Sequence, residues 1–155
     1  MNILEHVLVA KPPFARPANI MSGIPIELST VRPPGFPHSL YEELWHLNYW
    51  LHFSLALMRG ENPSILEHNS DSFPSDNDRL SESSWPTLLK QVSEGLEAVS
   101  SLAQNGTELS RKFYQDRTVE GELIVVASHN AYHFGRMVTL RQILGIWSSD
   151  LGDSW

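Results

Sequence analysis

The sequence predicts an all-α domain, a four-helix bundle, and three observations support that prediction. Apolar residues recur with helical spacing over residues of about 39–60, 83–104 and 119–144. Start and stop signals flank these three segments. No segment shows the alternation of a strand over a convincing length, and the chain has no internal repeat. The 155 residues suit a single domain, 1–155, with one core.

The N-terminal 37 residues are expected to supply the fourth helix in pieces. Prolines in "KPPFARP" and "VRPPGFP" forbid long helix interiors there. We expect a short helix over about 2–10, another over about 14–23, and irregular chain around "PPGFP". Together with the three long helices, this broken one completes the bundle.

The first long helix begins with a capping box. Ser39 is followed three residues later by Glu42, so that each side chain can bind the other residue's backbone N–H. The helix is expected to end near Gly60. Its interior face, within about 40° of His46, gathers Ser39, Glu42, Trp50, Phe53 and Leu57.

Residues 60–82 are polar and acidic, and they form a longer connection than a bundle requires. A linker is the simpler interpretation, and a loop that covers the mouth of a site is the functional one. The next helix starts at Ser83 or Ser84, with Pro86 in its first turn, and Asn105-Gly106 ends it. Its core stripe comprises Leu88, Leu89, Val92, Leu96, Val99 and Ala103.

The last helix carries two histidines on its interior stripe. Thr118 is the expected N-cap, and Gly145 is the expected stop. The residues within about 40° of His133 are Val119, Glu122, Val126, His129, Met137, Leu140 and Leu144. His129 and His133 lie four residues apart, so both rings project to the same side, and one divalent ion can bridge them.

A third histidine strengthens the case for a metal site. An isolated pair more often binds a carbonyl or a carboxylate, but His46 also lies on the interior face of its own helix. Burying three imidazoles costs on the order of several kcal/mol unless each finds a partner, and one shared cation satisfies all three. Three nitrogen ligands leave coordination positions open, as catalytic sites do. We therefore predict that His46, His129 and His133 are metal ligands.

Other polar residues near this stripe have simpler interpretations. Glu42 serves the capping box or, as the alternative, accepts a hydrogen bond from His46 one turn away. Glu122 lies about 10 Å along the axis from His129, and the helix dipole favours an acid there. Five more residues are assigned away from the metal. His38 is assigned to a turn, with the site mouth as the alternative, and His52 to a surface or helix contact. Tyr132 is assigned to an interhelix contact, and His6 and His68 to solvent.

Composition excludes several classes of protein. A net charge of −7 with only 11 Lys and Arg argues against a nucleic-acid partner. The chain has no cysteine, so it has no disulfide, no thiolate nucleophile and no Cys-ligated zinc, and we expect a reducing cytoplasm. The opening "MNILEHVLVAKPP" does not read as a signal peptide, and no apolar run is long enough to span a membrane.

Three stretches resemble the DinB/YfiT-like superfamily over about 14–147: "PPGFPHSLYEELWHLNYW", "DNDRLSESSWPTLLKQVSEGLEAV" and "TVEGELIVVASHNAYHFGRMVTLRQILGIW". The resemblance implies an up-down-down-up bundle in which His46, His129 and His133 bind nickel, zinc, iron or manganese, and it implies a homodimer. Relatives commonly carry Gln, as "HxGQI", where this chain has Arg136. A cation there could change which anion or thiol the mouth of the site prefers, so Arg136 is a candidate substrate contact.

The resemblance implies three functions. Some relatives are S-transferases or isomerases that use a low-molecular-weight thiol such as mycothiol, bacillithiol or glutathione, and we favour this function, with a small-molecule substrate. Others are regarded as metal-dependent hydrolases, for which Glu42 is the one interior carboxylate placed to act as a base. The third is a non-enzymatic metal-binding or stress-related protein.

Overall fold

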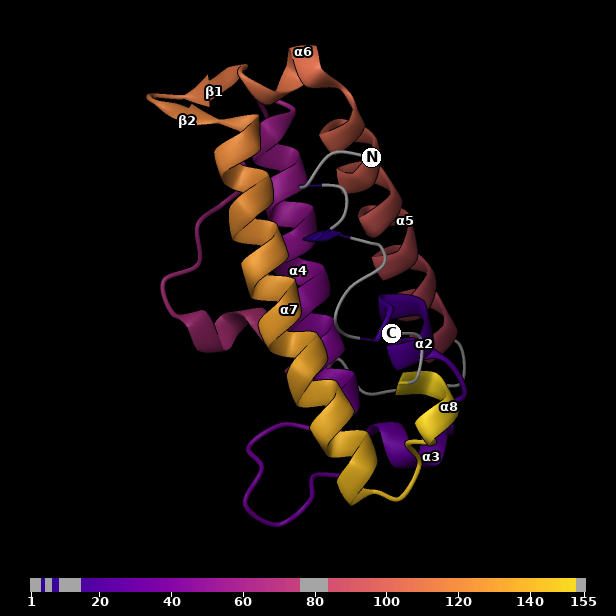
Figure 1. Cartoon of the computed structure of the whole chain (residues 1–155). Helices are drawn as coiled ribbons and strands as arrows, with labels where there is room; N and C mark the ends of the chain where they lie inside the picture. The colour runs from indigo at the N-terminus through magenta and orange to yellow at the C-terminus, as the bar shows by residue number, and fades with distance from the viewer. Residues whose placement is uncertain (1–3, 5–6, 9–14, 76–83, 153–155) are drawn as a thin grey trace.

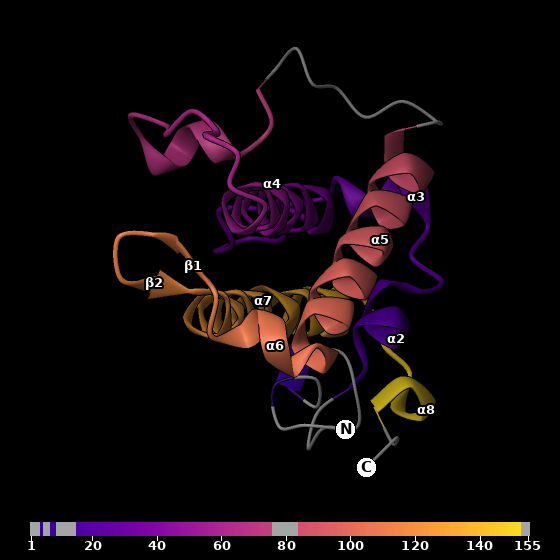
Figure 2. The same cartoon turned by 90° about the horizontal axis from the view of Figure 1, so that it is seen from above.

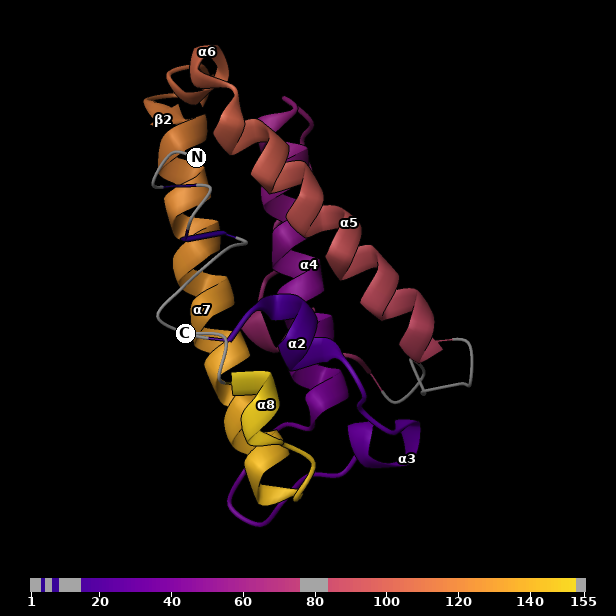
Figure 3. The same cartoon turned by 45° about the vertical axis from the view of Figure 1, so that its right-hand side comes forward.

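The computed structural model describes residues 4, 7–8, 15–75 and 84–152. Three long helices dominate it: α4 (Leu40–Met58), α5 (Ser84–Gln104) and α7 (Val119–Ile143). The α4 helix packs against both of the others (Figures 1 and 2). The α4 and α5 helices run in the same direction and α7 runs in the opposite one (Figures 1 and 3), which is the order of the last three helices of an up-down-down-up bundle. The all-α class is confirmed.

Short elements surround these helices. In place of the helix expected over 14–23, the structure has α2 (Pro17–Met21), and α3 (Ile26–Ser29) follows it. Of the helix expected over 2–10, only Leu4, Val7 and Leu8 lie among the described residues, and they are helical. The remaining short helices are η1 (Asn69–Ser72), α6 (Gly106–Leu109) and α8 (Ser149–Gly152). Within the described residues, no helix is both long and apolar enough to cross a membrane.

A small hairpin precedes α7, and its two strands were not predicted. Strand β1 (Lys112–Tyr114) pairs antiparallel with β2 (Arg117–Thr118). Strands of three and two residues are too short to show an alternation in the sequence. The hairpin places Arg117 beside the first turn of α7 and Arg111 near the end of α4, where Arg111 donates to the Met58 carbonyl.

The predicted helix ends are confirmed at atomic detail. Ser39 and Glu42 form the reciprocal capping box, and Thr118 accepts a hydrogen bond from the Gly121 N–H at 3.2 Å. Gly60 and Gly145 have positive φ values of 80° and 70°. After both glycines the next residue donates back into the helix, so each ends in a Schellman motif.

The core lies where α4 meets its two neighbours. Gly95 of α5 allows a close approach to α4, because a Cβ there would lie 2.7 Å from a methyl carbon of Leu51. The predicted face of α4 is only partly right, since Trp50, Phe53 and Leu57 are half-buried. Because α5 and α7 cover α4 on two sides, the buried face of α4 is wider than the predicted one. The core of the long helices includes Leu44, Leu47, Leu51, Leu55, Val92, Val99, Leu123, Met137 and Leu140.

We expect Ser39→Ala to lower the free energy of unfolding by about 1 kcal/mol, because it removes the side-chain acceptor at the start of α4. Urea unfolding measures this as a lower midpoint with an unchanged m-value. The control is Ser101→Ala, an exposed serine within α5, for which the change should stay within about 0.5 kcal/mol. Equal losses in both variants would contradict the capping assignment.

Candidate metal centre

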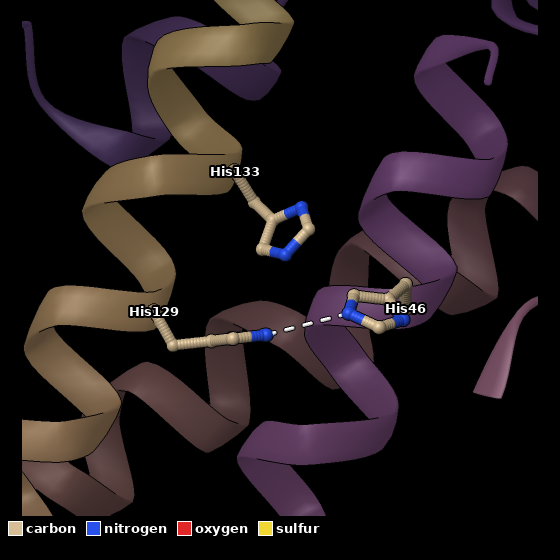
Figure 4. A group of neighbouring side chains, drawn as sticks. All are labelled: His46, His129 and His133. Atoms are coloured by element: carbon tan, nitrogen blue, oxygen red, sulfur yellow. Dashed lines mark hydrogen bonds between the residues drawn. The ribbon is translucent and has the colours of Figure 1, made fainter. Parts of the chain in front are cut away.

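Three histidine rings face one another between α4 and α7 (Figure 4). His46 comes from α4, and His129 and His133 lie one turn apart on α7. The Nε2 atoms of His46 and His129 are 3.4 Å apart. One ligand nitrogen from each of the three rings lies within 4.8 Å of the other two. The structure therefore brings together the three histidines that were predicted from the sequence.

This donor set fits a divalent metal ion. Two imidazole nitrogens that share a tetrahedral ion at 2.0–2.1 Å lie about 3.3 Å apart, which is close to the separation of the His46 and His129 nitrogens. Imidazole nitrogen suits zinc, nickel and iron. Three ligands leave at least one coordination position for water or substrate. The cluster can thus hold a metal ion and leave it accessible.

The Nδ1 atom of His46 is held by a serine from the loop after α4. Ser72 is fully buried, and its Oγ lies 2.7 Å from His46 Nδ1. The same hydroxyl donates to the Asn69 carbonyl at 2.5 Å, so it accepts from the ring nitrogen. A proton on Nδ1 leaves the lone pair of a neutral ring on Nε2, which faces the other histidines.

A buried carboxylate holds His133 in the same way. Glu43 is fully buried, and its Oε2 lies 2.7 Å from His133 Nδ1. Its other oxygen accepts from Arg136 at 2.7 Å. Such partners of metal-binding histidines fix the ring orientation and the position of the free nitrogen. Sequence reasoning missed Glu43, although its place three residues before His46 puts both side chains on one side of the helix.

The electrostatics of the site keep two of its rings neutral and its carboxylate charged. Burial, reinforced by the neighbouring histidines, lowers the pKa of His46 to about 4. Burial and His133 lower the pKa of His129 to about 4, although the nearby Asn130 amide acts in the opposite direction. Burial alone would raise the pKa of Glu43, but hydrogen bonds from His133 and Arg136 outweigh it and hold that pKa below its usual value.

The histidines line a cavity of about 500 Å³ whose wall includes the loop after α4. Phe73 stacks on His46 with ring centroids 4.2 Å apart, and His38 stacks on the other face of Phe73 at 3.9 Å. The functional interpretation of segment 60–82 is therefore confirmed for residues 69–73, which close one side of the site. His38 lines the mouth, which was the alternative to its turn assignment.

The remaining predicted residues have other environments. Glu42 caps α4 and accepts from Arg32, and the carboxylate in contact with a site histidine is its neighbour Glu43. Arg136 lines the cavity, but Glu43 binds its guanidinium. Tyr132 is 61% exposed and lines the cavity mouth, so its assignment to an interhelix contact was wrong.

Glu122 and two further histidines lie away from the three-histidine cluster. Glu122 is buried near the start of α7, where it accepts from Ser54 and Arg117. His52 contacts the Gln91 carbonyl of α5 at 3.3 Å, as expected for a helix contact, and His68 is exposed. His6 lies outside the described residues.

Comparison with known proteins agrees with this geometry. The model of the DinB superfamily matches residues 16–137, which is most of the chain. A search of curated proteins and a search of solved structures each find no significant match. The match covers α4, α5 and nearly all of α7, including the three histidines. The chain therefore belongs to the DinB superfamily.

Proposed function

We propose that the protein binds one divalent metal ion through His46, His129 and His133 and uses it as a thiol-dependent S-transferase or isomerase. The observation that supports metal binding best is the convergence of the three rings, two of which are fixed through Nδ1 by Ser72 and Glu43. Three imidazoles accept most first-row ions, so nickel, zinc, iron and manganese all fit. The thiol chemistry comes from the resemblance to other superfamily members.

The residues around the ion position would bind and orient the substrate. A divalent ion in such a site lowers the pKa of a thiol or water that binds to it, and so provides a nucleophile at neutral pH. Trp50, Phe73 and Tyr132 line the cavity with aromatic rings, which suit an apolar electrophile. The guanidinium of Arg136, which is partly exposed, lies at the mouth beside Tyr132.

Transferase chemistry is favoured over hydrolysis because the carboxylate in the described lining of the cavity is not free to act as a base. Among the described residues that line the cavity, Glu43 is the only carboxylate. It is fully buried, and both of its oxygens already accept hydrogen bonds, from His133 and Arg136. A general base must reach the proton that it removes, and Glu43 is not placed to do so. The homodimer and the cytoplasmic location that the sequence suggests stay predictions.

Metal binding by the three histidines is tested by titration. Isothermal titration of the metal-free protein with Zn²⁺ or Ni²⁺ should give one site, and a free ion concentration of 100 Kd should stabilise the fold by about 2.7 kcal/mol. EDTA should remove the ion and reverse the stabilisation. His129→Ala should abolish both the binding and the stabilisation. His68→Ala, which changes an exposed histidine, is the control and should retain both. Binding that survives His129→Ala would place the ion elsewhere.

A second prediction isolates the loop serine. Ser72→Ala removes the partner of His46 Nδ1 and should weaken metal affinity about 10- to 100-fold, as losses of comparable partners do. Ser70→Ala, an exposed serine of the same short helix, is the matched control and should leave the affinity unchanged. The competition of each variant with a chromophoric chelator gives both affinities. Equal affinities for the two variants would show that the loop does not orient His46.

The third prediction tests catalysis. The metal-loaded protein should consume a low-molecular-weight thiol in the presence of an electrophile, and both chelation and His129→Ala should abolish the reaction. Thiol loss is followed with a thiol-specific reagent, and panels of esters and amides are assayed in parallel. Thiol consumption that does not depend on His129 would count against the transferase. Ester or amide turnover without thiol turnover would support the hydrolase instead.

A further inference from the structure

His38 lies at the mouth of the three-histidine cavity, the space of about 500 Å³ that the three predicted ligands line, but it is not one of those ligands. It comes directly before Ser39, the N-cap of α4. Phe73 lies between the rings of His38 and His46 and stacks on both, at interplanar angles of 9° and 16°. His38 is therefore held one ring's thickness away from a metal ligand.

The ring nitrogens of His38 are not engaged by the protein. Within the described part of the chain they form no hydrogen bond, and neither nitrogen is fully buried. Stacking on Phe73 uses the face of the ring, so the in-plane lone pair of a neutral imidazole stays open. A molecule in the cavity can reach a basic nitrogen here.

The other groups in the described lining are not placed to accept a proton. The three predicted ligands use their free nitrogens for the ion, and both oxygens of Glu43 accept hydrogen bonds from His133 and Arg136. A tyrosine and an arginine, such as Tyr132 and Arg136, are already protonated at neutral pH. His38 is the remaining base of this lining.

The charged groups that act on His38 are arranged in pairs. Arg32, in the loop before α4, pairs with Glu42, and Arg136 of α7 pairs with Glu43. Because these charges offset one another, burial has the largest influence and lowers the pKa of His38 below its usual value of 6.5. The ligand ring on the far side of the stack is also neutral at pH 7. His38 is thus neutral at pH 7 and able to accept a proton.

We propose that His38 is the base of the three-histidine cavity and carries the proton of the nucleophile to the second reactant. That the nucleophile is a thiol rests on the proposed function. The S–H bond breaks, the proton moves to a ring nitrogen of His38, and sulfur keeps the electron pair. This pair forms the new C–S bond. The atom of the electrophile that gains the displaced pair then takes the proton from His38, so the ring ends neutral.

A weak base of this kind suits a thiol better than water. A free thiol has a pKa of about 8.5, whereas that of bulk water is about 15.7. An imidazole with a lowered pKa is a weak acceptor, so the thiol proton is the easier one for it to take. The same property makes the protonated ring a stronger acid, which returns the proton readily.

Two substitutions separate proton transfer from packing. Gln at this position keeps a polar side chain and Phe keeps a ring that can stack on Phe73, but neither carries a proton. With 2-mercaptoethanol and styrene oxide as reactants, both His38→Gln and His38→Phe should lower turnover by the Zn²⁺-loaded protein about 100-fold. Added imidazole should restore part of it. Zn²⁺ affinity should stay within about twofold of wild type, because the ligands and their partners are unchanged.

His52→Gln, which changes an exposed histidine of the same helix, is the control and should keep wild-type turnover. Wild-type turnover in His38→Phe would show that this ring acts only by stacking, and it would overturn the proposal.

A second readout does not depend on turnover. The ring resonances of His38 are followed by NMR against pH in the Zn²⁺-loaded protein, with and without saturating 2-mercaptoethanol. A thiol that loses its proton leaves a negative charge near the ring, which should raise the measured pKa of His38 by about one pH unit. An unchanged pKa would overturn the proposal, and failure of the thiol to bind would overturn the transferase with it.

The base and the transferase can fail separately. Thiol turnover that both His38 variants retain would leave the transferase and overturn the base. Hydrolysis of p-nitrophenyl acetate that depends on His38, in a protein that turns over no thiol, would leave the base and overturn the transferase. If neither reaction occurs, the NMR titration decides the assignment of His38.

Discussion

The central constraint on this structure is the need to hold three imidazole rings together in the interior with a free nitrogen on each. Two of the rings are fixed through Nδ1, His46 by Ser72 and His133 by Glu43. Each of these partners is itself fully buried and bound by another group, the Asn69 carbonyl or Arg136. A buried polar cluster is stable only when its members are satisfied, so the outer partners are as necessary to the site as the histidines.

The topology of the bundle supplies one of these partners. Because α4 and α5 run in the same direction, the chain must return along α4, which is about 28 Å long, before α5 begins (Figure 1). A short turn cannot make this connection, and the segment between Met58 and Ser84 is correspondingly long. On its way it carries Ser72 and Phe73 past His46. The loop that closes the site is thus a consequence of the helix order.

Periodicity was enough to predict the three long helices and the three histidines, because both depend on which face of a helix is buried. Glu43 could also have been found, since it lies three residues from His46 on α4. Ser72, Phe73 and His38 could not, because their contacts depend on how a long loop folds over a helix, and nothing local encodes that. The hairpin before α7 escaped prediction for a different reason: its strands of three and two residues are too short to show an alternation.

Arg136 acquires a physical role through Glu43. A fully buried carboxylate is costly unless a cation compensates its charge. Arg136 donates to the oxygen that His133 does not use, and the hydrogen bond with Glu43 in turn raises the pKa of the arginine. The arginine thereby stabilises the ionised form of Glu43, which holds the His133 ring. Because the charges of Arg136 and Glu43 cancel, a bound metal ion would give the three-histidine cavity its positive character.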